Sequence, residues 1–177
     1  MILILLGYMG SGKSTYGKLL SEKIQREFID LDDYIESKEQ MSILKIFESK
    51  GEIYFRKKEN YYLKSLIQER ENVVIGLGGG TPCYSNNMEL IKKIPNVTTV
   101  FINTSLDLLT ERLFIDKLNR PLVKSIDSKS DLKEFIAKHL FERNQFYQQA
   151  DFTIKVTDNK INETVDNLKR VYDNVTL

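Results

Sequence analysis

The chain has 177 residues and a formal net charge of +1, with 41% hydrophobic residues. This is typical of one globular domain, expected here over residues 1–177, and the near-neutral charge argues against nucleic acid or a membrane surface as a partner. A single cysteine excludes an internal disulfide, and with one histidine it is too few ligands for a typical zinc site. The apolar start, Met1 to Leu6, lacks the basic lead-in of a signal peptide and is too short to span a bilayer. We therefore expect a buried strand there and a cytoplasmic location.

Expected strands and helices alternate along the chain. Short apolar runs predict strands at 2–6, 28–30, 73–75, 100–102 and 152–156. Helical patterns occupy a first stretch ending near residue 26, then 33–68 with a break near Gly51, 86–94, 106–114, 131–149 and 161–174. This alternation predicts an α/β fold, a parallel sheet with right-handed crossovers and helices on both faces. Ligands of such sheets bind at the carboxyl ends of the strands, where the segments 7–14, 30–32 and 78–80 would converge.

The segment 116–130 interrupts this alternation. It is polar and irregular in pattern, and it is longer than most connections between secondary-structure elements. Long polar loops beside a ligand site often close over the ligand and exclude water. We therefore predict that this segment is a mobile lid.

The first predicted strand runs into a glycine-rich turn, Gly7-x-x-x-x-Gly12-Lys13-Ser14, which fits the Walker A pattern without a mismatch. Glycines let the backbone turn tightly and point N–H groups at phosphate oxygens, and the helix that begins here adds the positive end of its dipole. In this pattern Lys13 reaches the β- and γ-phosphates of ATP, and the Ser14 hydroxyl ligates Mg²⁺. The alternative, a glycine-rich turn with an incidental lysine, leaves unexplained why the motif follows a buried strand and precedes a helix.

Acidic residues close the second predicted strand, at Asp30, Asp32 and Asp33. In an extended chain, Asp30 and Asp32 lie on one side and Asp33 lies on the other. Two carboxylates beside a phosphate loop can divide the work, one holding Mg²⁺ through water and the other orienting an attacking hydroxyl. The alternative is that Asp30 or Asp32 caps the helix that follows, and capping and catalysis can coexist.

Six motifs, in order, resemble those of the shikimate kinase family across essentially the whole chain. They are Gly7 to Thr15 with Met9, Asp30-x-Asp32, Gly51-Glu52-x-x-Phe55-Arg56, Leu77-Gly78-Gly79-Gly80, Arg120-Pro121-Leu122, and Arg143 ahead of Phe146-Tyr147. One motif would mean little, but six at compatible spacing make chance a poor explanation. The sequence departs from the family pattern after Arg143, where Asn144-Gln145-Phe146 stands in place of a stretch with proline and leucine, and at Leu122-Val123, which replaces a commoner double leucine.

The resemblance implies a three-layer P-loop kinase fold with a helical substrate-binding region at about 33–62. It also implies a reaction, the ATP-dependent phosphorylation of the shikimate 3-hydroxyl to shikimate 3-phosphate in chorismate biosynthesis, with Mg²⁺ as the cofactor and a monomeric enzyme. Arg112 lies one residue out of register with an adenine-contacting arginine of the family. The implied ATP-binding residues are Gly10, Ser11, Gly12, Lys13, Ser14, Thr15, Arg112 and Arg120.

The resemblance assigns roles on the acceptor side as well. Asp32 would bind the shikimate hydroxyls, and Arg56 and Arg143 would grip the carboxylate, for which a planar guanidinium is well suited. Asp30 would support Mg²⁺ together with Ser14. The implied substrate-binding residues are Asp32, Arg56, Gly78, Gly79, Gly80 and Arg143, and the implied catalytic residues are Lys13, Asp32 and Arg120, the last carried onto the phosphates by the lid.

Other interpretations make different demands on the sequence. A gluconate kinase or a nucleoside monophosphate kinase does not account for the paired arginines and the triple glycine. A guanine-nucleotide switch would carry an Asn-Lys-x-Asp segment, which is absent. A catalytically silent homologue should have lost Lys13, Asp32 or Arg120, and all three are present. We expect no catalytic role for Cys83 or His139.

Overall fold

The structure is a computed structural model that describes residues 1–176, apart from the side chain of Asn119. Five parallel strands form one sheet in the order β2-β3-β1-β4-β5. The strands are β1 (Ile2–Leu6), β2 (Glu27–Asp30), β3 (Val73–Gly76), β4 (Val97–Thr104) and β5 (Phe152–Val156). The helices are α1 (Lys13–Ile24), α2 (Leu31–Glu39), α3 (Ile43–Glu69), α4 (Asn87–Lys92), α5 (Leu106–Ile115), α6 (Lys129–Tyr147) and α7 (Ile161–Thr176), with 3₁₀ turns η1 (Thr81–Cys83) and η2 (Lys117–Asn119). The predicted α/β fold with a five-stranded parallel sheet is confirmed.

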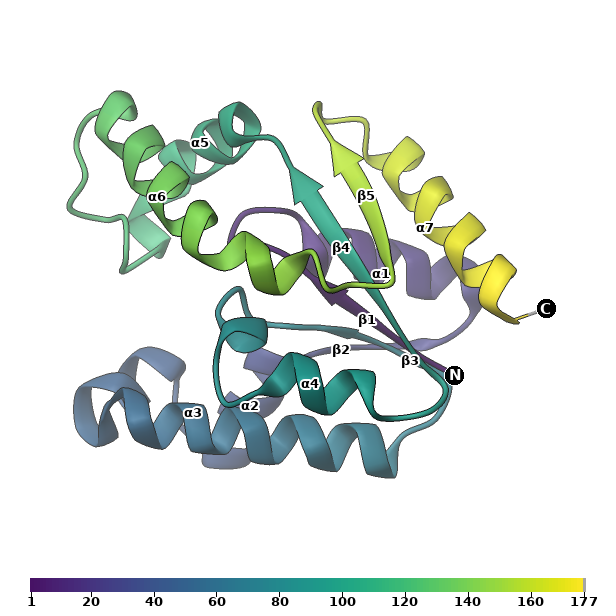
Figure 1. Ribbon diagram of the computed structural model, residues 1–177. Helices are drawn as coiled ribbons and strands as arrows, with labels where there is room; N and C mark the ends of the chain where they lie inside the picture. Colours follow the sequence, from purple (N-terminus) through teal and green to yellow (C-terminus); the bar gives the residue numbers. More distant parts are fainter. Residues whose placement is uncertain (177) are drawn as a thin grey trace.

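Helices cover both faces of the sheet (Figure 1). The central strand β1 explains the three layers, because its side chains alternate between the two faces. Ile2, Ile4 and Leu6 pack into one core with residues of α2, α3, α4 and α6. Leu3 and Leu5 pack into a second core with residues of α1 and α7. A strand buried on both faces needs a continuous apolar run, which is what this sequence supplies.

None of the helices within residues 1–176 has the length and apolarity needed to span a bilayer.

The stretch predicted as one helix over 33–68 is two helices. α2 ends at Glu39, Gln40 adopts a left-handed conformation with φ of 51°, and the Ser42 side chain caps α3. Glycine is the usual residue at such a helix end, so a glutamine there is no signal in the sequence. The break predicted near Gly51 is present as a kink inside α3, where φ is 78°.

The predicted lid, 116–130, is a series of turns between α5 and α6. η2 occupies 117–119, further turns follow, and α6 begins at Lys129 within the predicted segment. Val123 is fully buried in the core, and the Ile126 N–H donates to its carbonyl at 3.1 Å. Leu122, next to Val123, is 61% exposed. The segment is therefore anchored near its middle, and its mobility stays a prediction.

The carboxyl ends of β1, β2 and β3 bring together the phosphate loop, the acidic residues at the start of α2, and the triple glycine. An added Cβ on Gly79 would lie 3.0 Å from the backbone nitrogen of Met9. The triple glycine therefore approaches the phosphate loop so closely that a side chain at Gly79 would collide with its backbone. The topology thus creates one shared edge, and the candidate site is built on it.

Candidate active site

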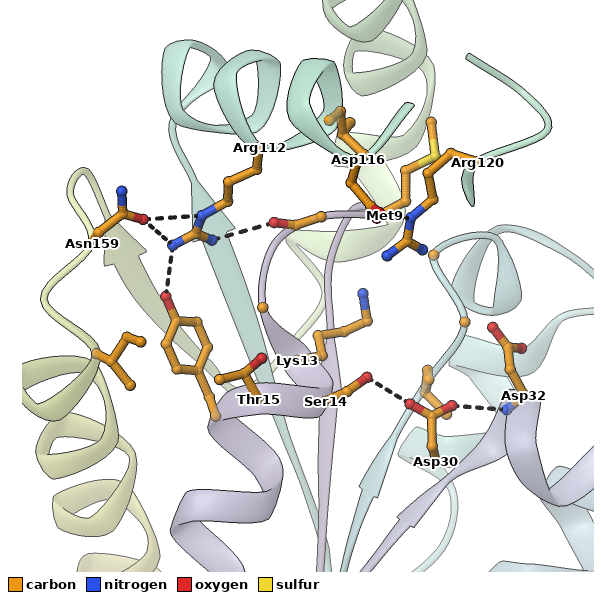
Figure 2. Close-up of a pocket in the computed structure, with 18 residues that line it drawn as sticks. Met9, Lys13, Ser14, Thr15, Asp30, Asp32, Arg112, Asp116, Arg120 and Asn159 are labelled. Carbon is orange, nitrogen blue, oxygen red and sulfur yellow. Dashed lines mark hydrogen bonds and ion pairs between the residues drawn. The ribbon is translucent and has the colours of Figure 1, made fainter. Parts of the chain in front are cut away.

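A cavity of about 430 Å³ opens at this edge of the sheet (Figure 2). Most predicted site residues line it, namely Gly10, Gly12, Lys13, Ser14, Thr15, Asp30, Asp32, Gly78, Gly79, Arg112 and Arg120. Four predicted residues are outside the lining: Ser11, Arg56, Gly80 and Arg143. The cavity therefore brings together most residues predicted for ATP and the acid predicted for the attacked hydroxyl, whereas the two arginines predicted for the carboxylate lie beyond it.

Glycine is required at two places in the phosphate loop. Gly10 and Gly12 have φ of 76° and 97°, a region that residues with side chains rarely adopt. At Gly12, a Cβ would also lie 2.5 Å from the ring of Tyr16. Ser11 is fully buried, and its N–H donates to the Tyr8 carbonyl at 3.2 Å. The loop therefore holds the start of α1 against the cavity, with the positive end of the helix dipole directed at any bound anion.

Lys13 is the first residue of α1, and it is buried. Its Nζ donates to the carbonyl oxygens of Gly7 and Tyr8 at 2.9 and 3.0 Å. Burial lowers the pKa of Lys13 to about 8, although the nearby carboxylates of Asp32 and Asp30 act in the opposite direction. Because burial removes water from the Lys13 ammonium group, an anionic ligand in the same cavity would strongly stabilise its charge.

Ser14 and Asp30 form a pair that suits a hard cation. Ser14 Oγ donates to Asp30 Oδ2 at 2.6 Å, and Asp30 Oδ1 accepts from the Asp32 N–H at 3.1 Å. The second contact makes Asp30 the N-cap of α2, so capping and a position beside the phosphate loop are both observed. Within residues 1–176, no cluster of three or more His, Cys, Asp or Glu side chains could hold a metal ion by itself. Mg²⁺ needs fewer protein ligands, because it keeps several waters and takes phosphate oxygens, and a hydroxyl with a carboxylate fits that pattern.

Asp32 presents its carboxyl group to the cavity from the start of α2 (Figure 2). An added Cβ on Gly78 would lie 2.7 Å from Asp32 Oδ1, so the missing side chain of the glycine leaves the space that this carboxyl group occupies. Burial, together with the neighbouring carboxylates of Asp30 and Glu59, raises the pKa of Asp32 to about 7, although Lys13 and Arg56 act in the opposite direction. A carboxylate with a pKa near neutrality is suited to accept a proton from a reacting hydroxyl.

Arg56, on α3, is held by a buried carboxylate. Its Nη1 lies 2.9 and 3.1 Å from the two oxygens of Glu59, a side chain that is 1% exposed. The Thr81 hydroxyl donates to the same carboxylate at 2.6 Å, and the guanidinium lies 4.0 Å from the centroid of the Tyr84 ring. An added Cβ on Gly80 would lie 2.9 Å from Arg56 Nη2. Arg56 is therefore fixed against the triple glycine, with Glu59 as the partner expected three residues along the helix.

Arg143 approaches the same region from α6. Its Cζ lies 5.7 Å from the centroid of the Tyr8 ring, within the range of a cation–π contact. Burial raises the pKa of the Cys83 thiol to about 11, and both Arg143 and Arg56 oppose that rise. Both guanidinium groups therefore lie within electrostatic range of this one thiol. A raised pKa disfavours the thiolate, the nucleophilic form of this cysteine.

Arg112 ties the phosphate loop to the loop that follows β5 (Figure 2). Its Nη1 donates to the carbonyl oxygens of Gly10 and Ser11 at 3.3 and 3.2 Å. Its Nη2 donates to the Tyr16 hydroxyl at 3.1 Å and to Asn159 Oδ1 at 2.9 Å. Neither Tyr16 nor Asn159 is among the predicted site residues. Asn159 follows the carboxyl end of a parallel strand, which is the signal that could have identified it.

Arg120 reaches the cavity from the predicted lid. Its Nε donates to Asp116 Oδ2 at 2.8 Å, and both side chains line the cavity. In Figure 2 the guanidinium extends into the space above Lys13. The charge of Arg120 also lowers the pKa of Lys13, although its effect is smaller than that of burial and those of the Asp32 and Asp30 carboxylates. Arg120, Lys13 and Arg112 therefore share one cavity, and such a group of cations favours a polyphosphate ligand.

Comparison with known proteins agrees with this geometry. A sequence profile of the family described as shikimate kinase matches residues 9–173. A shikimate kinase of Flavobacterium johnsoniae is 46% identical over 94% of this chain and 95% of its own. A crystal structure of a shikimate kinase from Bacteroides thetaiotaomicron has a TM-score of 0.88 at 37% identity and covers 98% of both chains. A solved structure of a shikimate kinase from Acinetobacter baumannii in complex with shikimate has a TM-score of 0.86 at 30% identity, over 99% of this chain and 94% of that one. With the profile and the relatives matching nearly the whole length, the chain belongs to the shikimate kinase family.

Proposed function

We propose that the protein transfers the γ-phosphate of ATP to the 3-hydroxyl of shikimate, which gives shikimate 3-phosphate and ADP. The observation that carries the proposal is that Lys13 and Asp32 line the same cavity, so that a phosphate-binding cation and a carboxyl group of raised pKa meet at one place. The family membership of the chain and the shikimate complex of the Acinetobacter baumannii enzyme support shikimate as the acceptor.

On the nucleotide side, the phosphate loop would hold the phosphates through backbone N–H groups and the Lys13 ammonium. The pair of Ser14 and Asp30, 2.6 Å apart, would hold Mg²⁺ together with phosphate oxygens and water. When bound, the ion supplies charge neutralisation at the transferring phosphoryl group. Arg112 would lie beside the adenine, at the end of the cavity that Asn159 also lines.

On the acceptor side, Asp32 would accept a hydrogen bond from the attacking hydroxyl and receive its proton as the new O–P bond forms and the bond to the ADP oxygen breaks. Arg56 and Arg143 would bind the substrate carboxylate, and the Gly79 N–H would contact the substrate. Arg120 would neutralise charge that develops late in the transfer. The support for these roles is that Asp32 and Arg120 line the same cavity and that Arg56 and Arg143 both lie within electrostatic range of Cys83.

A coupled assay of ADP release over a panel of acceptors tests the proposal. With Mg-ATP, we expect rapid ADP release with shikimate and little with gluconate, nucleoside monophosphates or no acceptor. Turnover with gluconate or a nucleotide in place of shikimate would identify another P-loop kinase, and no turnover with any acceptor would identify a silent nucleotide-binding homologue. A monomeric state and a cytoplasmic location stay predictions; light scattering addresses the first.

Arg56→Ala should weaken shikimate binding by about 10- to 150-fold, since a charge-assisted contact contributes about 1.5–3 kcal/mol. The loss also leaves the buried Glu59 carboxylate without its cation, so calorimetric titration should be accompanied by a thermal melt. Lys57→Ala is the matched control, because Lys57 is an exposed cation next in the chain. An unchanged Kd for Arg56→Ala, in a protein that melts normally, would mean that the carboxylate binds elsewhere.

Arg120→Ala should reduce kcat by about 10²–10³-fold and leave the Kd of shikimate within a few-fold, because the contact strengthens as the phosphoryl group moves. Lys124→Ala, an exposed cation in the same segment, should retain activity. Hydrogen–deuterium exchange should show residues 116–130 gaining protection when an ATP analogue and shikimate are added. Equal protection in both states would make the segment a fixed loop.

A further inference from the structure

One face of α6 points a row of side chains at the active-site loops. Phe135, His139, Arg143 and Tyr147 follow one another at intervals of four residues, which places them in line along the helix. Two of the four make hydrogen bonds to site loops that come from distant parts of the sequence. Arg143, the proposed carboxylate ligand, lies between those two.

The first contact is made to the phosphate loop. Tyr8 is 1% exposed, and its hydroxyl lies 3.1 Å from His139 Nδ1. The His139 ring in turn packs on Phe135, with 4.2 Å between ring centroids. The Tyr8 ring is also the surface on which the Arg143 guanidinium lies, at 5.7 Å. The hydrogen bond to His139 therefore anchors the hydroxyl end of the ring that supports Arg143.

The second contact is made to the triple glycine. The Tyr147 hydroxyl donates to the Gly79 carbonyl at 2.6 Å, and its ring packs on Phe101 with centroids 5.2 Å apart. One turn of helix separates Tyr147 from Arg143, and one turn separates Arg143 from His139. The backbone on both sides of Arg143 is thus tied to a site loop. Arg56 has a buried carboxylate at 2.9 Å, whereas the ion pairs within residues 1–176 do not include Arg143.

We propose that Tyr8 and His139 are positioning residues that hold the Arg143 guanidinium in place for the carboxylate of the substrate, with the Tyr8 hydroxyl as the link between the phosphate loop and α6. The proposal rests on the proposed function, because it concerns the carboxylate grip of that same site. In this arrangement Arg56 is positioned by a charge, through Glu59. Arg143 is positioned by the Tyr8 ring, whose hydroxyl is bonded to His139, and its guanidinium also interacts with the Tyr147 hydroxyl.

The electrostatics of the cluster support this arrangement. Burial lowers the pKa of His139, the charge of Arg143 lowers it further, and Glu142 acts in the opposite direction. These effects favour the neutral imidazole, which keeps a lone pair for a hydrogen bond. A neutral His139 leaves Arg143 as the cation of this row, which avoids repulsion between two adjacent positive charges.

The test compares variants that remove one atom or one ring at a time. Tyr8→Phe deletes the hydroxyl and keeps the ring, and His139→Leu deletes the partner. We expect each to raise the Kd of shikimate by about 3- to 10-fold, the range that one hydrogen bond supplies, with kcat and the KM of ATP within twofold. His139→Asn keeps a hydrogen-bonding group near Nδ1 and should restore most of the affinity. Lys138→Gln, at the exposed neighbour on the same helix, should behave as wild type.

A double-mutant cycle shows whether the effect passes through Arg143. Tyr8→Phe should have no further effect on the Kd of shikimate in an Arg143→Ala background, because there is no guanidinium left to position. If Tyr8→Phe raises the Kd of shikimate by the same factor in the wild-type and the Arg143→Ala backgrounds, the proposal is overturned. An unchanged Kd of shikimate for Tyr8→Phe would also overturn it. A fall in kcat and in melting temperature without a change in Kd would also overturn it, since that pattern marks a structural role only.

NMR of the single histidine separates this proposal from the proposed function. In the ligand-free protein, Arg143→Ala should raise the pKa of His139, because a neighbouring positive charge is removed, and Tyr8→Phe should shift its Nδ1 resonance. Shikimate binding should also raise that pKa, since the carboxylate neutralises Arg143. If wild type fails to bind shikimate, the proposed function fails, and the ligand-free spectra still decide whether the cluster exists. A His139 signal that neither substitution moves would overturn the positioning pair.

Discussion

Replacing Lys13 with alanine should lower kcat by about 10³-fold or more, and should leave the protein folded. The ammonium is the buried cation at the base of the cavity, and it would neutralise charge on the β- and γ-phosphates as the transfer proceeds. A single charge-stabilising donor typically contributes 10²–10³-fold, and an ammonium acting on two phosphates should contribute at least as much. Steady-state ADP release with saturating ATP and shikimate measures the loss.

The direction in which Lys13→Ala changes the stability of the ligand-free protein can be predicted. The folded pKa of Lys13, about 8, is below its ordinary value, so burying the charged form costs stability at every pH below about 8, and the cost declines as the pH rises above it. Lys13→Ala removes that cost, so the ligand-free variant should melt no lower than wild type at pH 7. Lys18→Ala, at an exposed lysine of the same helix, is the control and should keep full activity. Turnover within tenfold of wild type for Lys13→Ala would exclude Lys13 from the chemistry.

Replacing Asp32 with asparagine should lower kcat by about 10²–10⁴-fold, the usual contribution of a general base, while the Kd of shikimate changes by less than about tenfold. The asparagine still accepts a hydrogen bond from a hydroxyl but cannot take its proton. Asp33→Asn is the matched control, because Asp33 is an exposed acid next in the chain. A kcat for Asp32→Asn within fivefold of wild type would show that Asp32 does not act as a base.

The same residue predicts a pH dependence. Asp32 must be ionised to accept a proton, so kcat/KM for shikimate should rise with pH through about 7 and level off above it. Because the folded pKa is raised above the unfolded value, the folded state binds this proton more tightly, and the ligand-free protein should lose stability as the pH rises from about 4 to 7. Asp32→Asn should flatten that decline and be more stable than wild type above pH 7, by about 1–3 kcal/mol. Chemical denaturation at pH 5 and pH 8 measures the difference.

The nucleotide side of the site could be predicted from the sequence because local rules determine it. The apolar run of β1, the glycines with positive φ and the first turn of α1 are consecutive, so each feature supports the next. The acids after β2 and the triple glycine after β3 follow from topology, since parallel strands deliver their carboxyl ends to one edge. The contact between Arg56 and Glu59 could also be predicted, because residues three apart on a helix are neighbours.

The remaining features depend on contacts between distant parts of the chain. The hydrogen bonds of Arg112 to carbonyl oxygens of the phosphate loop and to the Asn159 side chain give no signal in the sequence. The hydrogen bond between Tyr8 and His139 joins residues whose separation gives no periodic signal. The end of α2 at Gln40 was hidden because nothing in a glutamine marks a left-handed conformation. Such features become visible only when the packed fold fixes which side chains meet.

The place of β1 at the centre of the sheet has a consequence for how the protein is made. Leu3 pairs with Val74 on one side and with Thr98 on the other, so β1, which is synthesised before β3 and β4, has neither of these partners until much of the chain has followed. Pairings between such distant residues form slowly and leave apolar strand surface exposed in the meantime. A ribosome-bound chain that ends before β4 is complete should therefore remain protease-sensitive and fail to bind nucleotide, although it already contains every residue of the phosphate loop.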